Sequence, residues 1–407
     1  MRRFPPAIVL GIDSPIGLTV MRELGAYGVP VRGIGKPHSI GRSSRYCTDF
    51  VIRPEGPIAE WLPALIERSG ATALLAIGEQ DLLALAALPE TIAGCRILTP
   101  RAGPLATVLN KWATLKIAGT LGMDTPPSWQ PLPDEDIAAR AAEVSYPAVA
   151  KWADPADVAA SLVQHGLEFV KAEFLHGPAD VAALLERYAP LGRWPLIQSY
   201  CPGHGLGQML YMQRGIATLS FQHRRLHEWP PEGGVSTWCA AEPRDQHGEQ
   251  MQRSEALLRA VGWEGPAMVE YRHDPATGRY WLMEVNGRFW GSLPLAWHCG
   301  AQFAWEHYRR AVLGQTAAAP TPRDGLRARY VIPETRRLAR ILLHRSAIAD
   351  PTFFAQPVRD LASYVLGFVD PRTRYYVFSF RDPGPCLADL RGVVRKIARR
   401  ESPRRDG

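Results

Sequence analysis

The chain has 407 residues, 46% of them hydrophobic and 21% charged, with a formal net charge of +7. This length predicts two or three domains of roughly 100–200 residues each, and the composition is that of ordinary globular proteins, which excludes disordered and fibrous classes. No apolar run approaches the roughly 18–20 residues that a membrane-spanning helix requires.

The first hundred residues alternate short apolar runs with segments typical of helices. Predicted strands cover residues 7–12, 29–34, 73–77 and 96–99, and predicted helices end near residue 27 and cover 57–69 and 81–88. Strands that alternate with helices indicate a parallel, doubly wound sheet. We therefore expect an N-terminal α/β domain over residues 1–104.

The middle of the chain reads as two α+β lobes that follow a helix near 107–121 and a proline-rich linker. The first lobe has strands at 147–152, 168–174 and 195–201, with a helix at 178–189. The second has strands at 206–213 and 215–222, a helix near 249–261, and a hairpin of 267–272 and 280–285, whose turn residues are favourable. A helix near 301–313 closes this part, so we place a second domain at 105–314.

Positive charge is concentrated after a linker at 315–323. Residues 315–407 carry 18 basic and 9 acidic side chains, whereas the rest of the chain sums to about −2. Two basic amphipathic helices are predicted near 334–346 and 386–400; one face of the second carries Leu387, Leu390, Val394 and Ile397. The pattern favours a basic C-terminal extension that caps the body, with weak association with anionic membranes as the open alternative. Nucleic acid is a disfavoured partner, because no aromatic residues interleave the last arginine cluster.

The six cysteines lie far apart and form no C-x-x-C pair. This spacing predicts a reduced, cytoplasmic protein with neither a disulfide framework nor a structural zinc site. The apolar stretch at 7–12 is also too short for the core of an export signal.

Acidic and amide side chains lie at a two-residue spacing in the predicted hairpin. Glu284 and Asn286 point to the same side of one strand, and Glu270 can add a third oxygen from the partner strand. Carboxylate and amide oxygens suit Mg²⁺ that also binds nucleotide phosphates. Arg288 points the same way and can neutralise phosphate or carboxylate charge. A surface hairpin with solvated charges is the alternative interpretation.

Three further segments add to this pattern. Lys111 opens a predicted helix, Lys151 ends a short buried strand, and the apolar strand at 195–201 breaks into a loop. Only six of the 47 basic residues are lysines, so a lysine at such a position is informative. In order and spacing, these segments and the hairpin resemble the ATP-grasp superfamily over roughly residues 5–314. The resemblance implies that the domain at 105–314 has two lobes, with the lid lobe at about 144–203.

The resemblance implies a set of binding residues. The two lysines that contact the ATP phosphates are Lys111 and Lys151. The hinge strand beside the adenine contributes Gln198, Ser199, Tyr200 and Cys201, and His204 occupies the region that meets the ribose. The ligands of Mg²⁺, with Mn²⁺ as an alternative ion, are Glu270, Glu284 and Asn286, followed by the arginine of the family, Arg288.

The resemblance also implies a reaction. Such enzymes phosphorylate a carboxylate with ATP, and an amine then attacks the acyl phosphate to give an amide or peptide bond and ADP. His223, Arg224 and the following Arg225 come after the strand at 215–222 and are candidate contacts for the acyl phosphate or the substrate carboxylate. A solvated basic turn is the alternative there. The sequence contains no G-x-S-x-G, H-E-x-x-H or Walker motif that would indicate another chemistry.

Two positions differ from the family pattern. The segment after Lys151 has no glycine before Gly166, where a glycine-rich phosphate loop is usual, and no acidic residue follows the hinge to hold the ribose. Two alternatives therefore stay open: a nucleotide-binding module with little ligase activity, and an ATP-dependent phosphotransferase that acts on a hydroxyl. The carboxylate, the amine and the formation of a homodimer are left open.

Overall fold

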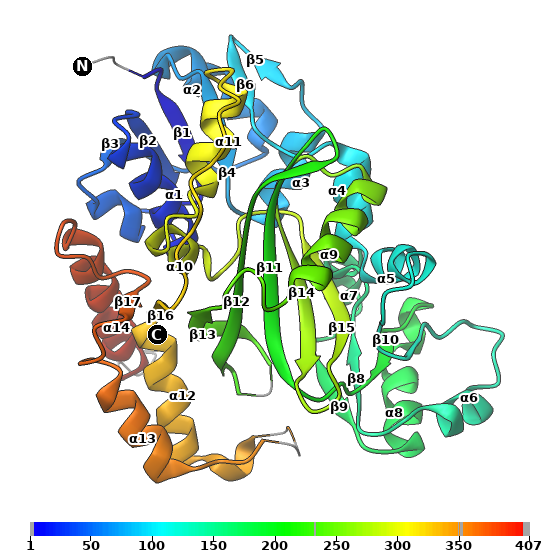
Figure 1. The fold of residues 1–407 in the computed structure, drawn as a ribbon. Helices are drawn as coiled ribbons and strands as arrows, with labels where there is room; N and C mark the ends of the chain where they lie inside the picture. Colours follow the sequence, from blue (N-terminus) through cyan, green and yellow to red (C-terminus); the bar gives the residue numbers. More distant parts are fainter. Residues whose placement is uncertain (1–3, 232, 349, 351–352, 402–407) are drawn as a thin grey trace, which may run out of the picture.

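The computed structural model describes residues 4–231, 233–348, 350 and 353–401. Over these residues the chain forms three β-sheets of six, four and seven strands, with helices packed around them (Figure 1). Its fold class is mixed α/β and α+β, as the sequence predicted.

The six-stranded sheet is the predicted doubly wound unit. Its strand order is β3-β2-β1-β4-β6-β5, and every pairing is parallel except that of the short edge strand β5. The strands are β1 (Ala7–Leu10), β2 (Val31–Gly35), β3 (Cys47–Ile52), β4 (Ala73–Ala76), β5 (Thr91–Ile92) and β6 (Cys95–Ile97). The helices are α1 (Pro15–Ala26), the 3-10 helix η1 (Ile40–Ser43), α2 (Ile58–Ser69) and α3 (Glu79–Ala86).

Both faces of this sheet are covered at its centre, which explains why every residue of β1 and β4 is apolar and buried. Alternate residues of β1 belong to different cores, so that Val9 packs in the cluster that includes α1 and Leu10 in the cluster that includes α2. The first cluster continues into the seven-stranded sheet through α10 (Leu293–His298) and α11 (Phe303–Ala311). The N-terminal sheet and the large sheet therefore share one apolar core.

The helix expected near 107–121 is two helices. Asn110 ends α4 (Ala102–Leu109) and caps α5 (Lys111–Thr120), because its side chain accepts a hydrogen bond from the Ala113 N–H at 2.9 Å. The break places Lys111 in the first turn of α5.

The four-stranded sheet forms a lobe with an apolar core of its own. Its order is β7-β10-β8-β9, from β7 (Ser128–Trp129), β8 (Ala148–Lys151), β9 (Glu173–Leu175) and β10 (Leu196–Ser199). Its helices are α6 (Ile137–Glu143), α7 (Pro155–Gln164), α8 (Pro178–Tyr188) and the 3-10 helix η2 (Ala189–Leu191). Helix α7, which begins at Pro155 after its Asp154 cap, occupies the segment where a glycine-rich loop is usual.

The seven-stranded sheet has the order β15-β14-β11-β12-β13-β16-β17, with α9 (Gly248–Val261) packed on it. Its main strands are β11 (His204–Gln213), β12 (Ile216–Trp229), β13 (Val235–Ala241), β14 (Gly265–Asp274) and β15 (Arg279–Asn286). Strand β12 continues to Trp229, so the expectation that His223, Arg224 and Arg225 follow the strand was wrong. The segment from Val235, for which the sequence predicted no strand, is strand β13.

Residues after 315 complete the large sheet and add three helices. Strand β16 (Arg327–Arg329) pairs with β13, and β17 (Thr373–Tyr375) pairs with β16. The helices are α12 (Val331–Leu343), α13 (Pro357–Leu366), α14 (Gly384–Glu401) and the 3-10 helix η3 (Arg345–Ala347). Arg22 of α1 holds this part through Asp382, whose carboxylate accepts from Arg22 Nε at 2.9 Å with both side chains buried. Among the described helices, none has the length and apolar character to cross a membrane.

Candidate functional site

The acidic side chains of the hairpin lie side by side on one face of the large sheet. Glu270 of β14 is paired directly with Glu284 of β15, and Met268 with Asn286. The Asn286 amide Nδ2 donates to Glu284 Oε1 at 3.3 Å. The structure thus brings the three predicted oxygen donors together, as the two-residue period of a strand requires.

Two lysines from other elements meet these carboxylates. Lys111 Nζ lies 3.3 Å from Glu284 Oε2, and its backbone N–H donates to the Ala153 carbonyl at 3.0 Å, which ties the start of α5 to the chain after β8. Lys151, the last residue of β8, interacts electrostatically with Glu284 and Glu270. Cations from α5 and from the four-stranded lobe therefore converge on the carboxylates of the large sheet.

This convergence changes the protonation of both partners. Burial works against the ionisation of Glu284, but the charges of Lys111, Lys151 and Arg225 outweigh it and lower its pKa to about 2. Burial lowers the pKa of Lys151 to about 8, although the two carboxylates favour its charged form. The site therefore holds a fully ionised Glu284 beside a lysine that titrates near neutral pH.

Arg225 reaches the site from β12 across β11, the strand between. Its Nη2 donates to Glu270 Oε2, and its Nη1 lies 3.3 Å from Glu228 Oε1. The side chain passes over Gly205, where an added Cβ would lie 2.7 Å from Arg225 Cδ. Because Gly205 has no side chain, the Arg225 guanidinium can cross β11 and reach Glu270.

His223 lies two residues before Arg225 and points the same way. It forms a row across the sheet with the residues paired to it in register: Gly207 on β11, Glu270 on β14 and Glu284 on β15. A Cβ on Gly207 would lie 2.5 Å from His223 Cε1, so this ring also needs the glycine. Burial and the charge of Arg225 lower the pKa of His223 to about 3, so its ring is neutral.

Arg224 and His204, two of the predicted site residues, lie on the opposite face of this sheet. Arg224 is paired in register with Leu206 and its Nε donates to Glu242 Oε1 at 2.9 Å. The His204 ring packs edge-on against His273, with ring centroids 5.1 Å apart. The structure brings neither of them to the carboxylates. If β12 had been predicted to continue past residue 222, the two-residue period of a strand would have placed Arg225 on the same face as His223.

The predicted hinge lies next to Lys151, since β10 pairs with β8 and Leu196 is opposite Lys151. Gln198 is buried and its Nε2 donates to Ser128 Oγ at 2.8 Å, while the backbone N–H of Ser199 donates to the Pro127 carbonyl. Arg272, from the large sheet, donates to the Cys201 carbonyl at 3.3 Å and to the Tyr200 hydroxyl at 3.2 Å. The end of the hinge strand is therefore held between the two lobes.

Arg288 joins the site to the N-terminal sheet. Its Nε lies 3.6 Å from Glu79 Oε2, and Glu79 opens α3 at the carboxyl end of β4. Ligands of open α/β sheets bind at this edge. Arg288 thus marks where the edge of the first sheet meets the acidic hairpin.

The donor set fits a magnesium ion only in part. Within the described residues, no group of three His, Cys, Asp or Glu side chains could hold a metal. Glu270, Glu284 and the amide of Asn286 offer hard oxygens, but Arg225 and Lys111 already balance the charge of the carboxylates. This chemistry suits Mg²⁺ that arrives with phosphate oxygens, the usual situation for this ion in nucleotide sites.

Comparison with known proteins gives structural matches only. No protein-family model matches the sequence, and a search of curated proteins gives no match. The ADP complex of purK, N5-carboxyaminoimidazole ribonucleotide synthetase, is 13% identical with a TM-score of 0.62, over 90% of this chain and 98% of that one. The L-amino acid ligase from Bacillus licheniformis is 14% identical with a TM-score of 0.56, over 76% and 75%.

Carboxylases also match. The biotin carboxylase domain of Hydrogenobacter thermophilus 2-oxoglutarate carboxylase, solved with MgADP and bicarbonate, is 16% identical with a TM-score of 0.60, over 79% of this chain and 73% of that one. Pyruvate carboxylase from Rhizobium etli is 18% identical with a TM-score of 0.57, over 77% of this chain, which spans only 29% of that protein. Their shared architecture and the two-lobed arrangement described above show that this chain has the ATP-grasp fold.

Proposed function

We propose that the protein is an ATP- and Mg²⁺-dependent ligase that activates a carboxylate as an acyl phosphate and joins it to an amine, releasing ADP. The observation that carries the proposal is the meeting of Lys111, Lys151 and Arg225 with Glu270 and Glu284, from separate elements, at one place between the lobes. Among the structural neighbours, an L-amino acid ligase and a carboxyaminoimidazole ribonucleotide synthetase support this reaction class.

In this proposal the lysines bind the triphosphate. Phosphoryl transfer depends on positioning and charge neutralisation more than on covalent catalysis, so two ammonium groups beside the phosphates stabilise the negative charge of the transition state. When Lys111 contacts phosphate, its ion pair with Glu284 weakens, and the Glu284 carboxylate becomes available to a metal ion.

Glu270, Glu284 and Asn286 would hold Mg²⁺ against the phosphates, where the ion would neutralise charge and orient the γ-phosphate. The ADP and MgADP bound to two of the neighbours support a nucleotide with magnesium. The hinge strand, from Gln198 to Cys201, is the proposed adenine contact.

Arg225 and Arg288 are the proposed contacts of the substrate carboxylate. Both guanidinium groups flank the acidic hairpin: Arg225 comes from β12, and Arg288 follows β15 and faces Glu79 at the edge of the first sheet. A guanidinium binds a carboxylate through two parallel hydrogen bonds. His223 is neutral and buried, so we assign it the positioning of Arg225 rather than a charge.

One observation favours a second candidate, a nucleotide-binding module with weak catalysis. Helix α7 stands in place of the glycine-rich loop, so the backbone N–H groups that such a loop supplies to phosphates have no equivalent in that segment. Mg-ATP binding without turnover in any substrate combination would support this candidate over the ligase.

The test is release of ADP and phosphate in the presence of ATP, Mg²⁺ and panels of carboxylates and amines. Lys111→Ala should lower the rate by about 10²-fold, because a positioned charge is lost from the transition state. Lys116→Ala is the matched control, since Lys116 is exposed on the same helix and lies over the Trp112 ring at 5.6 Å. Equal rates for the two variants would contradict the assignment of Lys111.

A further inference from the structure

The C-terminal extension exposes an unusual amount of apolar surface. Of the 21 large apolar side chains that are exposed in the described part of the chain, 13 lie between residues 342 and 394. Soluble monomers rarely gather exposed apolar side chains in one region unless that region meets a partner. Figure 1 shows α12, α13 and α14 together along one side of the molecule.

Helix α13 carries part of this surface as one stripe. Val358, Leu361 and Val365 follow a helical spacing of three and four residues, and no residue of the helix is buried. The helix is held from another face, where Asp360 accepts from Arg337 Nη2 at 3.0 Å and the Tyr364 hydroxyl lies 2.7 Å from Thr335 Oγ1. Polar side chains of α13 therefore anchor the helix to α12, and its apolar stripe faces outward.

Helix α14 repeats the pattern. The sequence predicted that Leu387, Leu390, Val394 and Ile397 share one face of this helix. The first three are exposed at the same helical spacing, and the side chain of Ile397 lies outside the described set. The helix is anchored by its other contacts, which include Arg395 Nη1 to His38 Nδ1 at 3.0 Å.

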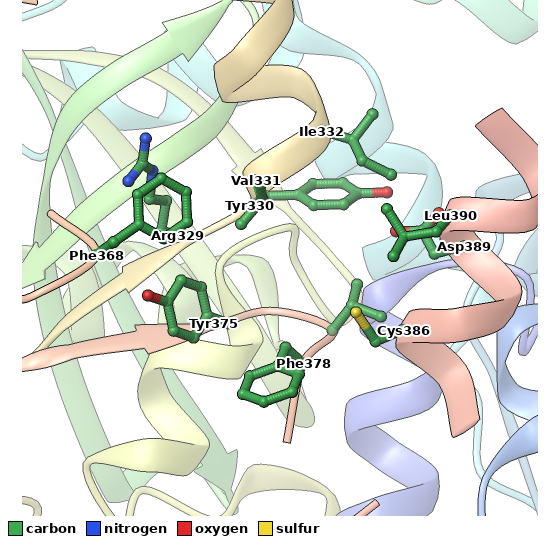
Figure 2. Close-up of a pocket in the computed structure, with 11 residues that line it drawn as sticks. Arg329, Tyr330, Val331, Ile332, Phe368, Tyr375, Phe378, Cys386, Asp389 and Leu390 are labelled. Carbon is green, nitrogen blue, oxygen red and sulfur yellow. The ribbon is translucent and has the colours of Figure 1, made fainter. Parts of the chain in front are cut away.

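A cavity of about 320 Å³ lies between Phe368, two residues after α13, and the start of α14. Figure 2 shows Phe368 and Tyr375 on one side of it and Cys386 and Leu390 of α14 on the other. Nine of its eleven lining residues are aromatic, aliphatic or cysteine, and the guanidinium of Arg329 is turned away from it in the view. The cavity is thus an apolar hollow that Phe368, which follows α13, and Leu390 of the α14 stripe both line.

Positive charge accompanies the apolar stripes. Arg359 on α13, Arg391 on α14 and Arg345 before α13 are exposed, and residues 315–407 carry twice as many basic as acidic side chains. Apolar side chains flanked by arginines are the pattern of helices that lie in the interface of a membrane. Each arginine near an anionic surface adds electrostatic attraction.

From these observations we propose that the extension is a peripheral docking surface for an anionic lipid bilayer. The docking surface is formed by Val358, Leu361, Val365, Phe368, Leu387 and Leu390, with the cavity between them receiving apolar groups of the lipid. A second copy of the chain fits less well, because a two-fold interface would place the same basic surface against itself. The proposal is independent of the ligase reaction.

The test is sedimentation of the full chain with vesicles of phosphatidylcholine, with and without phosphatidylglycerol. We expect binding to the vesicles that contain phosphatidylglycerol, weakened by salt, with little binding to phosphatidylcholine alone. The double variant Val358→Glu, Val365→Glu should bind about tenfold or more weakly, because two apolar contacts with lipid are lost. Leu390→Glu, on the other helix, should also weaken binding.

The matched control is Val163→Glu on α7. Val163 is 81% exposed, close to the 84% of Val358, so each substitution leaves the fold intact and adds the same charge. Val163→Glu should leave vesicle binding nearly unchanged. Equal loss in the control, no binding to anionic vesicles, or binding that ignores both salt and the lipid charge would overturn the proposal.

Two other partners have their own signatures in the same experiment. Light scattering that shows a dimer, which Val358→Glu, Val365→Glu converts to a monomer, would assign the surface to a second copy. Binding to DNA that salt abolishes but the double variant leaves intact, without vesicle binding, would assign the charge to nucleic acid. Either result would overturn the lipid proposal.

Discussion

Lys111 and Glu284 form an ion pair at 3.3 Å between the first residue of α5 and the middle of β15. These residues are far apart in the sequence, and the pair exists because Asn110 breaks the preceding helix and restarts it at Lys111. The contact joins the start of α5 to the acidic hairpin, where Glu284 also meets the charge of Lys151.

Removing the Glu284 carboxylate should abolish turnover. Glu284→Gln keeps the shape of the side chain but removes the charge that faces Lys111 and the proposed metal, so we expect ADP release to fall by about 10²–10³-fold. Glu249→Gln is the control, since that side chain is 81% exposed on α9. Turnover that stays within a few-fold of the control would exclude Glu284 from the site.

Arg225 and Arg224 form a natural pair of matched variants. Arg225→Lys keeps a positive charge but loses the planar fork that reaches Glu270 and would bind a carboxylate. We expect the KM for the carboxylate to rise by about tenfold, with ATP binding little changed. Arg224→Lys, on the opposite face of the same strand, should leave KM nearly unchanged; the reverse ranking would show that substrate lies on the other face.

The sequence predicted that Glu270, Glu284 and Asn286 lie together, because their placement depends only on the strand period and the pairing within one hairpin. The parallel N-terminal sheet was predicted because its central strands β1 and β4 are apolar without interruption. Strand β3, which carries Thr48 and Asp49, gave no such signal and was not predicted. Strand β13 was missed because Gly233 and Gly234 precede it and suggest a loop, whereas pairing with β12 and β16 decides its conformation. Tertiary pairing of this kind leaves no periodic signal in the strand itself.

The choice between Arg224 and Arg225 shows the same limit. Adjacent arginines are equivalent in composition, and only the length of β12 decides which one faces Glu270. His204 illustrates a different cause: its place after the hinge suggested the ribose, but the register of β11 turns it to the face of His273. Register is fixed by the whole sheet, which local sequence does not reveal.

The glycines of β11 should be sensitive to the smallest substitution. Gly207→Ala would place a Cβ 2.5 Å from His223 Cε1, and because His223 is buried we expect a loss of about 1–3 kcal/mol in the free energy of unfolding. Gly119→Ala is the control, because a Cβ there meets nothing within 4 Å, and alanine in a helix should stabilise by up to about 1 kcal/mol. Chemical denaturation measures both; a stable Gly207→Ala variant would show that His223 can move aside.

Magnesium binding should require nucleotide. The two carboxylates of the site already face Arg225 and Lys111, so a lone Mg²⁺ gains little, whereas Mg-ATP also brings phosphate oxygens for the ion and for the lysines. Calorimetry should show weak or no binding of Mg²⁺ alone and clear binding of ATP with Mg²⁺. Tight binding of Mg²⁺ without nucleotide would contradict this description of the donor set.

The proposed ATP site should also lose affinity at high pH. Lys151 has a pKa lowered to about 8 by burial, so its positive charge is present below that pH and is lost as the pH rises through it. We expect kcat/KM for ATP, which reports the free enzyme, to fall above pH 8. In Lys151→Arg the fall should move to higher pH, since a guanidinium keeps its proton; an unchanged profile in this variant would assign the titration to another group.

Stability should depend on pH through Glu23, a buried carboxyl group of α1. Its Oε1 accepts a hydrogen bond from the backbone N–H of Trp305 at 2.8 Å. Burial, with a smaller repulsion from Glu306, nevertheless raises the pKa of Glu23 from 4.5 to about 8. A carboxyl group whose pKa is raised in the folded state stabilises that state most when it is protonated. Its contribution is therefore largest below pH 4.5 and is lost as the pH rises to about 8.

Glu23→Gln removes this titration and keeps a neutral side chain of the same size. We expect the melting temperature of the variant, relative to the native chain, to rise as the pH increases from 4.5 to 8 and to level off above that range. Glu67→Gln, an exposed position on α2, should show a flat difference over the same range. If the difference in melting temperature for Glu23→Gln were also independent of pH, the Glu23 carboxylate would ionise in the folded protein without cost. The contact between α1 and α11 would then be more hydrated than the burial of Glu23 indicates.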